Sequence, residues 1–385
     1  MNKSSSIIPP KHQCGTGVGV KTAIFHQALD NIGGAEIVTL TLARGFEADV
    51  YTTNIDREKI TAFGFEDVLP RLRSIGRIPA KAPFRQQLAL WKFRRLDLSG
   101  QYDRFVISGD WAVGGAVNNH PNLWYAHGPL DELWEFQNHV REETLAWWMR
   151  TAFDVWVALN QRLVKRYARH VDRWACNSEN VKKRIKKIFG ASAAVAYPPV
   201  QTSEYHYESP RGYWLSVNRL VGHKRIEIQL EAFRKMPNKR LVIAGSYEKG
   251  ARQFESYKEK LEQLKPENVT LLHWVSDKEL KTLYAGCIGF ITTAEREDFG
   301  MTAVEAMAAG KPVIAPDDGG YRESVVQGKT GILLHEMNTE RLAEAVKAID
   351  LELQNDPLRY RDACRARAKE FDTSIFIEKV NASLS

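Results

Sequence analysis

The sequence predicts an α/β protein with two domains, each built on a mainly parallel sheet. Stretches of strand and helix character alternate from residue 21 to about residue 351, which is the pattern of parallel sheets covered by helices. The chain of 385 residues is too long for one ordinary hydrophobic core. Pro198, Pro199 and Pro210 interrupt the apolar pattern, so the domain boundary is expected within residues 197–212.

The two ends of the chain differ from the predicted domains. Residues 1–20 are rich in serine near their start and contain Pro9 and Pro10, so we expect a flexible arm or a surface extension. Helices are predicted over residues 357–371 and 373–384. The expected domains are residues 21–205 and 206–371, followed by a C-terminal helix in residues 372–385.

The charge balance favours an anionic partner. The net charge is +7 at pH 7 and the isoelectric point is about 9.1. Cations concentrate in residues 182–187, on a predicted helix, and in residues 147–166, which begin with Trp147 and Trp148. Either these residues face a membrane surface, or the aromatic side chains pack in the core and the cations face water, which is the commoner arrangement. No nucleic-acid motif accompanies the charge, so nucleic acid is not an expected partner.

Several patterns that suggest other functions lack the required order or spacing. The glycines of residues 15–19 precede the first predicted strand, whereas a dinucleotide-binding loop follows that strand. Gly310 and Lys311 lack the upstream glycine and the Ser/Thr of a P-loop. Four cysteines occur without zinc-site spacing, and the second and third lie in predicted strands as small apolar residues: Cys14, Cys176, Cys287 and Cys364. Reduced thiols and a cytoplasmic location are expected.

Two segments of the N-terminal half place candidate residues after a strand. Residues 21–27 are a short apolar strand, and the helix that follows begins near Gly33 and Gly34. Paired glycines at a helix start let an anion approach the free amides. Residues 122–128 are predicted to form a strand ending at His127, and open α/β sheets bind ligands at such ends. Taken alone, a Gly-Gly pair is usually only a turn and a lone histidine is more often structural.

A strand beginning at residue 213 runs into a loop with two cations, Arg219 and Lys224, which could converge on one anion. A leaving diphosphate needs its negative charge neutralised, and guanidinium and ammonium groups can do this. Two surface cations in a basic protein are the simpler alternative. The next two strands, in residues 240–246 and 269–275, bring Gly245 and Val275 to turns, which are weaker candidates for phosphate and base contacts.

The most informative segment contains two carboxylates in different settings. Residues 287–293 are predicted to form a buried strand and residues 301–309 a helix. Glu297 therefore lies in the connecting loop, and Glu305 lies on the helix. The two acids are expected to have different roles.

The start of that helix offers free amide groups at Phe299, Gly300, Met301 and Thr302. Such amides can bind phosphate or sugar hydroxyl oxygens, and Gly300 lets a ligand approach the backbone closely. An ordinary βα turn with a solvated acidic loop is the alternative.

The pair Glu297 and Glu305 resembles the E-x7-E signature of retaining glycosyltransferases with the GT-B fold, the GT4 family. The continuation through Gly310 and Lys311 to Gly319 and Gly320 is also similar to the family pattern. The resemblance implies two Rossmann-like domains that face each other across a cleft, with the last helix crossing back to the N-terminal domain.

The family pattern implies a role for each candidate residue. Glu297 would lie beside the donor hexose, Glu305 would bind the nucleotide ribose, and Arg219 and Lys224 would bind the diphosphate. His127 would hydrogen-bond the donor sugar. The other expected donor-binding residues are Gly33, Gly34, Gly245, Val275, Asp298, Phe299, Gly300, Met301 and Thr302.

The resemblance implies transfer of a hexose from a nucleoside diphosphate sugar to a hydroxyl of a glycan or lipid-linked acceptor. No cofactor and no obligatory metal are expected, and the chain has no Asp-x-Asp motif. The sequence of residues 297–300 resembles mannosyltransferases, so GDP-mannose is the first expected donor. A lipid-linked acceptor would bring Trp147 and Trp148 to the cytoplasmic face of a membrane. A phosphorylase or epimerase of the same fold, and a non-catalytic protein that binds nucleotide sugars, remain alternatives.

Overall fold

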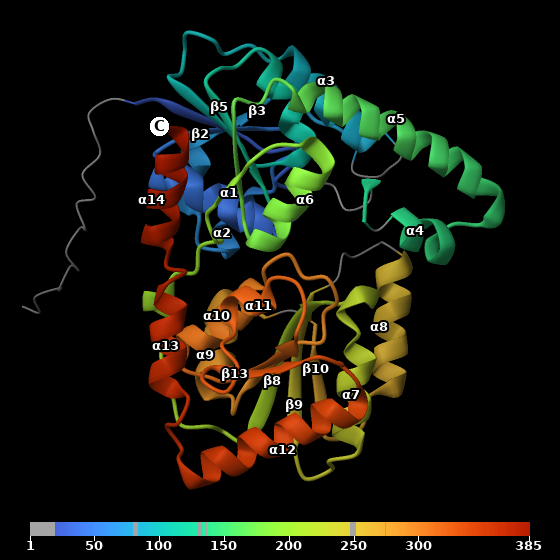
Figure 1. The fold of residues 1–385 in the computed structure, drawn as a ribbon, viewed down its shortest axis with the longest axis vertical. Helices are drawn as coiled ribbons and strands as arrows, with labels where there is room; N and C mark the ends of the chain where they lie inside the picture. The colour runs from blue at the N-terminus through green and yellow to red at the C-terminus, as the bar shows by residue number, and fades with distance from the viewer. Residues whose placement is uncertain (1–19, 80–83, 129–132, 136, 247–251, 274) are drawn as a thin grey trace, which may run out of the picture.

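The fold consists of two parallel sheets, each covered by helices (Figure 1). The computed structural model describes residues 20–79, 84–128, 133–135, 137–246, 252–273 and 275–385. The predicted arm up to residue 19, with Cys14 and its glycines, lies outside the described residues. All paired strands run parallel in both sheets. The predicted α/β class with two Rossmann-like sheets is therefore confirmed.

The sheet of the N-terminal domain has the strand order β3-β2-β1-β4-β5-β6-β7. Its strands are β1 (Thr22–Phe25), β2 (Asp49–Thr52), β3 (Leu72–Ser74), β4 (Arg104–Ile107), β5 (Asn122–Ala126), β6 (Arg173–Cys176) and β7 (Ala194–Val195). The order reverses beside β1, which pairs with β2 on one side and with β4 on the other.

The sheet of the C-terminal domain repeats this plan with the order β10-β9-β8-β11-β12-β13. Its strands are β8 (Tyr213–Arg219), β9 (Arg240–Ser246), β10 (Val269–Leu272), β11 (Phe290–Ile291), β12 (Val313–Pro316) and β13 (Gly331–Leu334). Here the order reverses between β8 and β11.

Helices cover both faces of each sheet. Those of the N-terminal domain are α1 (Gly34–Gly45), α2 (Arg57–Ala62), α3 (Arg85–Arg95), α4 (Gln137–His139), α5 (Arg150–Ala168) and α6 (Glu179–Phe189). The C-terminal domain has α7 (Ile226–Arg234), α8 (Arg252–Leu264), α9 (Asp277–Gly286), α10 (Met301–Ala308), α11 (Tyr321–Ser324), α12 (Thr339–Asn355) and α13 (Arg361–Lys369). The last helix is α14 (Thr373–Leu384).

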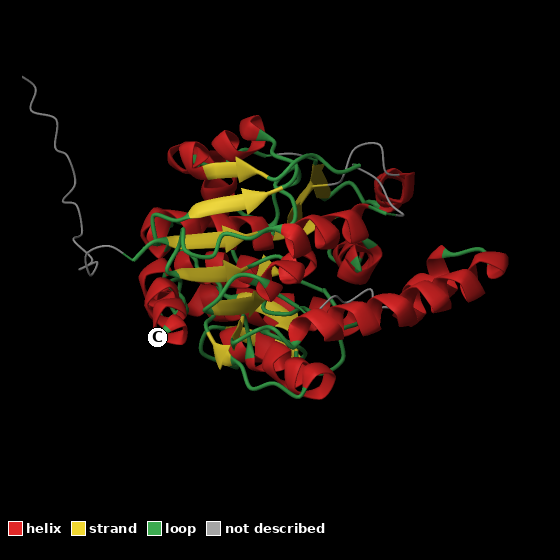
Figure 2. Cartoon of the chain, turned by 90° about the horizontal axis from the view of Figure 1, so that it is seen from above, coloured by secondary structure: helices red, strands yellow, loops and turns green. Residues whose placement is uncertain are grey.

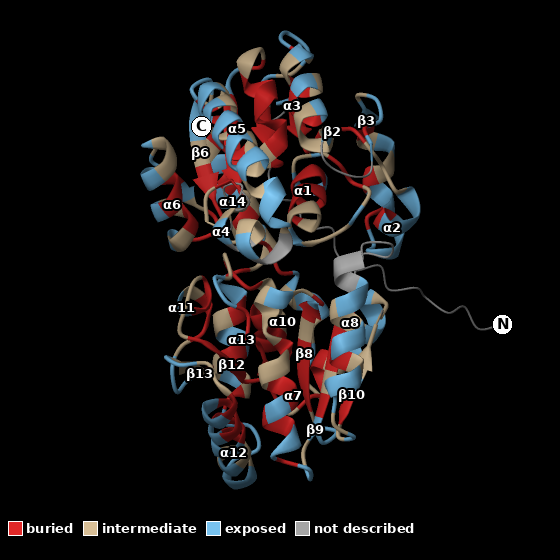
Figure 3. Cartoon of the chain, turned by 90° about the vertical axis from the view of Figure 1, so that its right-hand side faces the viewer, coloured by how far each residue is buried: buried red, intermediate tan, exposed pale blue. Residues whose placement is uncertain are grey.

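Alternating side chains of the N-terminal strands supply two separate cores. Phe25 of β1 and Phe105 of β4 lie in one buried cluster, whereas Ile24 and Val106 lie in the cluster on the other face. Figure 3 shows the strands of both domains as buried and the outer faces of their helices as exposed. The two sheets are therefore rigid supports for the loops at their edges.

Helix α14 completes the core of the N-terminal domain, although it follows the C-terminal domain in the sequence. Phe376, Val380 and Leu384 are buried in the same cluster as Ile24. The ring of Phe376 meets the ring of Tyr125 edge to face, with centroids 5.5 Å apart. Figure 1 shows α13 beside the lower domain and α14 beside the upper one. The chain thus crosses between the domains twice.

Helix α5 projects from the N-terminal domain as a long arm (Figure 2). Trp147 and Trp148, in the turn just before it, are 79% and 68% exposed. The alternative that these tryptophans pack in the core is therefore wrong. The buried residues of α5 begin only at Val157. No helix in the described part of the chain is long and apolar enough to cross a membrane.

Two local predictions around strands are corrected. Cys287 is the C-cap of α9 and not a strand residue, because that helix continues through Gly286 and β11 begins only at Phe290. The turn predicted at Gly245 is also wrong, because this residue lies inside β9. Leu220 packs where a Cβ of Gly245 would lie, so close packing explains the glycine. Cys176 lies in β6 as predicted.

Replacing Phe376 by alanine should destabilise the N-terminal domain by about 3 to 5 kcal/mol, because a buried aromatic ring is lost from its core. Urea unfolding, followed with a probe in each domain, measures this loss. Glu378→Ala, on the exposed side of the same helix, is the control and should change little. A loss confined to the C-terminal domain would contradict the packing of α14 described above.

Candidate active site

The candidate residues lie at the carboxyl edges of the two sheets, where the strand orders reverse. His26 directly follows β1, and Ser108 directly follows β4. In the other domain, Arg219 is the last residue of β8. Open α/β sheets bind their ligands at such points. A cavity of about 420 Å³ nearby is lined by both domains: Trp134, Glu135, Asn180 and Lys187 on one side, and Arg296, Asp318 and Gly319 on the other.

The loop that carries Glu297 rests directly on a second loop. The amide of Gly320 donates to the carbonyl oxygen of Glu297 at 2.9 Å. A side chain on Gly319 or Gly320 would collide with the backbone of residues 297–299. The two glycines therefore permit a backbone contact that fixes the Glu297 loop in place.

The residues after Glu297 anchor and turn the chain into α10. The ring of Phe299 is buried, with its centroid 5.3 Å from those of Tyr197 and Phe371. Gly300 has a left-handed φ of 85°, and the ring of Tyr321 occupies the space of a Cβ there. Met301 and Thr302 then form the first turn of α10. Phe299 can offer only its backbone to a ligand, because its side chain belongs to the core.

The structure brings Glu297 and Lys224 into an ion pair. Lys224 Nζ lies 2.5 Å from Glu297 Oε2, and the two side chains are 12% and 23% exposed. Arg219 also acts on Glu297 through its charge. Two cations and one carboxylate thus gather at the edge of the second sheet. This proximity is expected, because β8 and β11, the strands that lead to them, are neighbours.

Buried side chains hold the backbone of Lys224. Lys224 ends the short turn Gly222–Lys224 that follows β8. Thr293 Oγ1 donates to the carbonyl oxygen of Lys224 at 2.6 Å, and Gln229 Nε2 donates to Thr293 Oγ1 at 2.9 Å. Thr293 and Gln229 are fully buried. The ammonium group is therefore positioned from the end of β11 and from α7 together.

The charges around Glu297 keep it ionised. Burial alone would raise the pKa of Glu297, but the charge and hydrogen bond of Lys224, with smaller contributions from His223 and Arg219, hold that pKa below its ordinary value. A carboxylate in this place therefore stays negative at neutral pH.

Glu305 lies in a different environment. The hydroxyl of Tyr284 donates to Glu305 Oε2 at 2.8 Å. Burial raises the pKa of Glu305, and this hydrogen bond opposes the rise only in part. Val275 lies half-buried in the loop between β10 and α9, the helix that carries Tyr284. The structure thus associates Glu305 with α9 and Glu297 with the cations.

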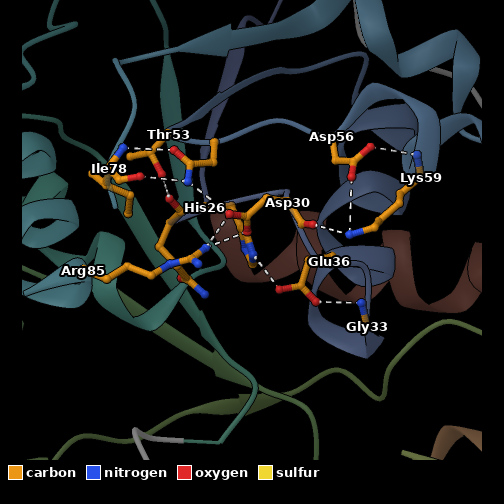
Figure 4. Close-up of polar contacts among 11 residues, drawn as sticks. His26, Asp30, Gly33, Glu36, Thr53, Asp56, Lys59, Ile78 and Arg85 are labelled. Carbon is orange, nitrogen blue, oxygen red and sulfur yellow. Dashed lines mark hydrogen bonds and ion pairs between the residues drawn. The ribbon is translucent and has the colours of Figure 1, made fainter. Parts of the chain in front are cut away.

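The predicted glycine pair begins α1. Gly33 is the N-cap of the helix, and its amide donates to Glu36 Oε2 at 2.9 Å (Figure 4). Gly34 is the first helical residue, and a Cβ on it would lie 3.6 Å from Met301 Sδ in the C-terminal domain. The glycine loop of one domain therefore faces the start of α10 in the other.

His127 lies just after β5, and Ser108 Oγ is 2.9 Å from its Nε2. The carboxylate of Asp298 fills the space of a Cβ on the next residue, Gly128. Asp298 itself is paired with Arg184 of α6. The His127 loop and the Glu297 loop thus meet between the domains.

Two residues that join the domains, Glu323 and Arg184, have no role of their own in the sequence-based predictions. The carboxylate of Glu323 accepts hydrogen bonds from the amides of Glu179 and Asn180, at 2.7 and 2.9 Å, at the start of α6. Arg184 belongs to the basic run of residues 182–187. Unlike a solvated cation it is buried, and it lies three residues after Val181 on the buried face of α6. A cation on the apolar face of a helix is the signal that could have identified it.

The fold and these residues define a two-domain α/β protein whose candidate site lies between two Rossmann-like sheets. A sequence profile described as "Glycosyl transferases group 1" matches residues 206–371, and one described as "Glycosyltransferase Family 4" matches residues 32–204. The chain belongs to this GT4 family of glycosyltransferases and has the GT-B fold.

Individual proteins support the same assignment. The chain is 34% identical over 369 residues to alpha-1,3/1,6-mannosyltransferase ALG2 of Dictyostelium discoideum, covering 81% of this chain and 85% of the relative. A GDP-mannose-dependent alpha-mannosyltransferase of Mycobacterium tuberculosis is 39% identical over 92 residues, or 24% of each chain. The crystal structure of Anabaena HepE in complex with UDP and glucose superposes with a TM-score of 0.73 at 19% identity, covering 95% of this chain and 99% of that one.

Lys224→Ala should raise the pKa of Glu297, because burial then acts without its strongest opposing charge. In the wild type the lowered pKa keeps the carboxylate ionised, and activity that needs it is lost only as the pH falls through that value. The variant should lose this activity at a higher pH, and its turnover at neutral pH should fall by roughly 2 to 4 kcal/mol of transition-state stabilisation. Lys239→Ala, which removes an ion pair with Asp350 elsewhere in the same domain, is the control. Identical pH profiles and rates for both variants would contradict the prediction.

Proposed function

We propose that the protein is a retaining mannosyltransferase that uses GDP-mannose and acts on a hydroxyl of a glycan or lipid-linked acceptor. The observation that carries this proposal is the cluster of Arg219, Lys224 and Glu297 at the edge of one sheet, opposite the glycine loop of the other. The similarity to the mannosyltransferase of Dictyostelium supports mannose as the sugar, and the similarity to the GDP-mannose-dependent enzyme of Mycobacterium supports GDP-mannose as the donor.

The chemistry follows from charge. As the bond between the sugar and the diphosphate breaks, negative charge develops on the leaving phosphate. Lys224 and Arg219 would neutralise it, and the free amides at the start of α10 would add hydrogen bonds. These fixed cations support a reaction without an obligatory divalent metal. Glu305 would bind the nucleotide ribose, and Asp298 would lie beside the donor sugar.

Glu297 remains negative in this scheme and would stabilise the positive charge that develops on the sugar ring. It is not assigned as a nucleophile, because its carboxylate is already bound to Lys224. The departing phosphate would accept the proton of the attacking acceptor hydroxyl, on the same face of the sugar. Retention of configuration then needs no protein-bound intermediate.

A membrane-associated acceptor is supported by the surface of α5. Trp147, Trp148, Val155 and Leu159 are exposed large apolar residues, and cations follow towards the end of the helix. Helix α3 lies alongside, since Gln87 Nε2 donates to Asn160 Oδ1 at 2.9 Å.

Helix α3 adds a second exposed stripe to this surface. Phe84, Leu88 and Trp91 are exposed at helical spacing, and the guanidinium of Arg95 lies 4.5 Å from the ring centroid of Trp91. Apolar stripes bordered by cations suit the interface of an anionic bilayer. We place the protein in the cytoplasm, at the cytoplasmic face of a membrane. The buried free thiols of Cys176, Cys287 and Cys364 accord with this location.

The donor is tested with a panel of GDP- and UDP-sugars, by thermal shift and donor hydrolysis, with and without EDTA. One sugar nucleotide, GDP-mannose, should stabilise the wild type by about 2.7 kcal/mol at a concentration of 100 Kd. The effect should disappear in Glu305→Ala, persist in EDTA, and be unchanged in Glu344→Ala, a surface carboxylate on α12.

Each other outcome points to an alternative. Binding of a sugar nucleotide without transfer or hydrolysis would favour a non-catalytic binding protein. Activity that requires inorganic phosphate would favour a phosphorylase, and conversion of the bound sugar without release would favour an epimerase. No response to any sugar nucleotide would end the proposal.

Membrane contact is tested by flotation with vesicles that contain anionic lipid, at low salt. The wild type should float with the vesicles, and the double variant Trp147→Ser with Trp148→Ser should remain in the soluble fraction. Leu351→Ser with Leu358→Ser removes two exposed apolar residues from the other domain and should float like the wild type. A wild type that stays soluble would exclude this part of the proposal.

A further inference from the structure

A continuous chain of hydrogen-bonded side chains runs through the N-terminal domain to His127. Its members are Glu36, His26, Thr39, Ser108 and His127. The contacts are 3.2 Å from Glu36 Oε1 to His26 Nε2, 3.0 Å from His26 Nδ1 to Thr39 Oγ1, 2.7 Å from Thr39 Oγ1 to Ser108 Oγ, and 2.9 Å from Ser108 Oγ to His127 Nε2.

Three of the five members lie at the ends of strands, and Glu36 and Thr39 lie on helix α1. His26, Ser108 and His127 follow β1, β4 and β5, which are neighbours in the sheet. Their side chains therefore meet at one edge. His26, Thr39 and Ser108 are fully buried, so water does not compete for these hydrogen bonds.

The protons in this chain can be assigned by counting donors. Besides Ser108 Oγ, Thr39 Oγ1 contacts the carbonyl oxygen of Ala35 at 2.8 Å, which can only accept, and His26 Nδ1 at 3.0 Å. The single hydroxyl proton of Thr39 is directed to one of these two groups and is not available to Ser108. Thr39 Oγ1 then has to accept from Ser108. The only proton of Ser108 is used in this way, and none is left for His127. His127 Nε2 must therefore carry a proton and donate it to Ser108 Oγ.

The other ring nitrogen of His127 is left as an acceptor. Burial, with the nearby charge of His26, lowers the pKa of His127 to about 3, so the ring is neutral and has only one proton. Because Nε2 holds that proton, Nδ1 has a free lone pair. The side-chain hydrogen bond of the ring uses Nε2, and the backbone of Ser108 also acts on the ring. The ring itself is held by the edge of Tyr125, with centroids 5.1 Å apart.

The far end of the chain reaches the glycine loop. Burial would raise the pKa of Glu36, but the hydrogen bond and charge of His26, with the amides of Glu36 and Gly33, hold it below its ordinary value. The carboxylate accepts from His26 Nε2 with one oxygen and from the Gly33 amide with the other, as Figure 4 shows. One carboxylate therefore positions both the glycine loop and His26.

We propose that Thr39 and Ser108 are positioning residues that hold His127 in its Nε2-protonated form, so that Nδ1 accepts a hydrogen bond from a sugar hydroxyl. The sugar as the partner of Nδ1 rests on the proposed function. The protonation pattern does not, because it follows from contacts within the protein. Such a site favours a sugar that donates a hydrogen bond to Nδ1. It disfavours a sugar carboxylate, whose oxygens would be repelled by the Nδ1 lone pair.

The protonation pattern is tested by nitrogen NMR on protein labelled with 15N histidine, at neutral pH and without ligand. His127→Gln identifies the His127 signals. The wild type should show a protonated Nε2 and an unprotonated Nδ1. A protonated Nδ1, an even mixture of the two forms or a doubly protonated ring would overturn the proposal.

Variants separate positioning from a general structural effect. Ser108→Ala should release the ring into a mixture of both neutral forms. Thr39→Val leaves the Ser108 proton free to bind His127 Nε2, so it should shift the population further towards the Nδ1-protonated form. The control is Thr52→Val, which removes a fully buried hydroxyl that has no hydrogen-bond partner in the described structure. Unchanged His127 signals in Ser108→Ala and Thr39→Val would overturn the positioning roles.

A kinetic measurement tests the sugar contact separately. In Ser108→Ala, kcat/KM with the preferred donor should fall roughly 2- to 10-fold, the effect of one impaired hydrogen bond, while Thr52→Val keeps the wild-type value. A Ser108→Ala enzyme with the NMR signature of a released ring and unchanged kcat/KM would overturn the sugar contact. Should no sugar nucleotide bind at all, the proposed function fails while the NMR result still decides the protonation pattern.

Discussion

The attraction between Glu297 and Lys224 is the interaction around which the C-terminal edge is organised. A mostly buried carboxylate without a cation would cost several kcal/mol or would take up a proton. Lys224 prevents both, and backbone contacts hold both loops: Thr293, in the Glu297 loop, binds the carbonyl oxygen of Lys224, and the amide of Gly320 binds that of Glu297. The protein therefore holds these charges in place by itself, which is what the proposed binding of a diphosphate beside the ammonium group requires.

The same edge also determines how the domains meet. Arg184 pairs with Asp298, the residue after Glu297, and Glu323 caps the start of α6. A helix start carries partial positive charge, so the Glu323 carboxylate is bound by both hydrogen bonds and the helix dipole. Separating the two domains would break these contacts. The candidate donor-binding residue Glu297 and Asp298, which joins the domains, are thus adjacent in the chain.

The sequence predicted those parts of the site that depend on local order. Arg219 ends a recognisable strand, Lys224 and Glu297 each follow one, and the paired glycines begin a recognisable helix. The chain from Glu36 to His127 could not be predicted in this way, because Thr39 and Ser108 are 69 residues apart and meet only through the order of strands in the sheet.

Burial was also harder to predict than secondary structure. Trp147 and Trp148 have a composition that suits either a core or a surface, and only the projection of α5 beyond the sheet decides between them. Cys287 was misplaced for a related reason. Its apolar neighbours suggest a strand, but the preceding helix runs through Gly286 and makes Cys287 its C-cap.

The path of the last helix bears on how the protein is made. During translation the N-terminal sheet leaves the ribosome first, yet the side chains of Phe376, Val380 and Leu384 that cover part of it are synthesised after the whole of the other domain. Until they arrive, the surface around Ile24 lacks its cover. Nascent chains should therefore need either rapid synthesis or a chaperone over this patch, even though each sheet contains only strands from one continuous stretch of the polypeptide.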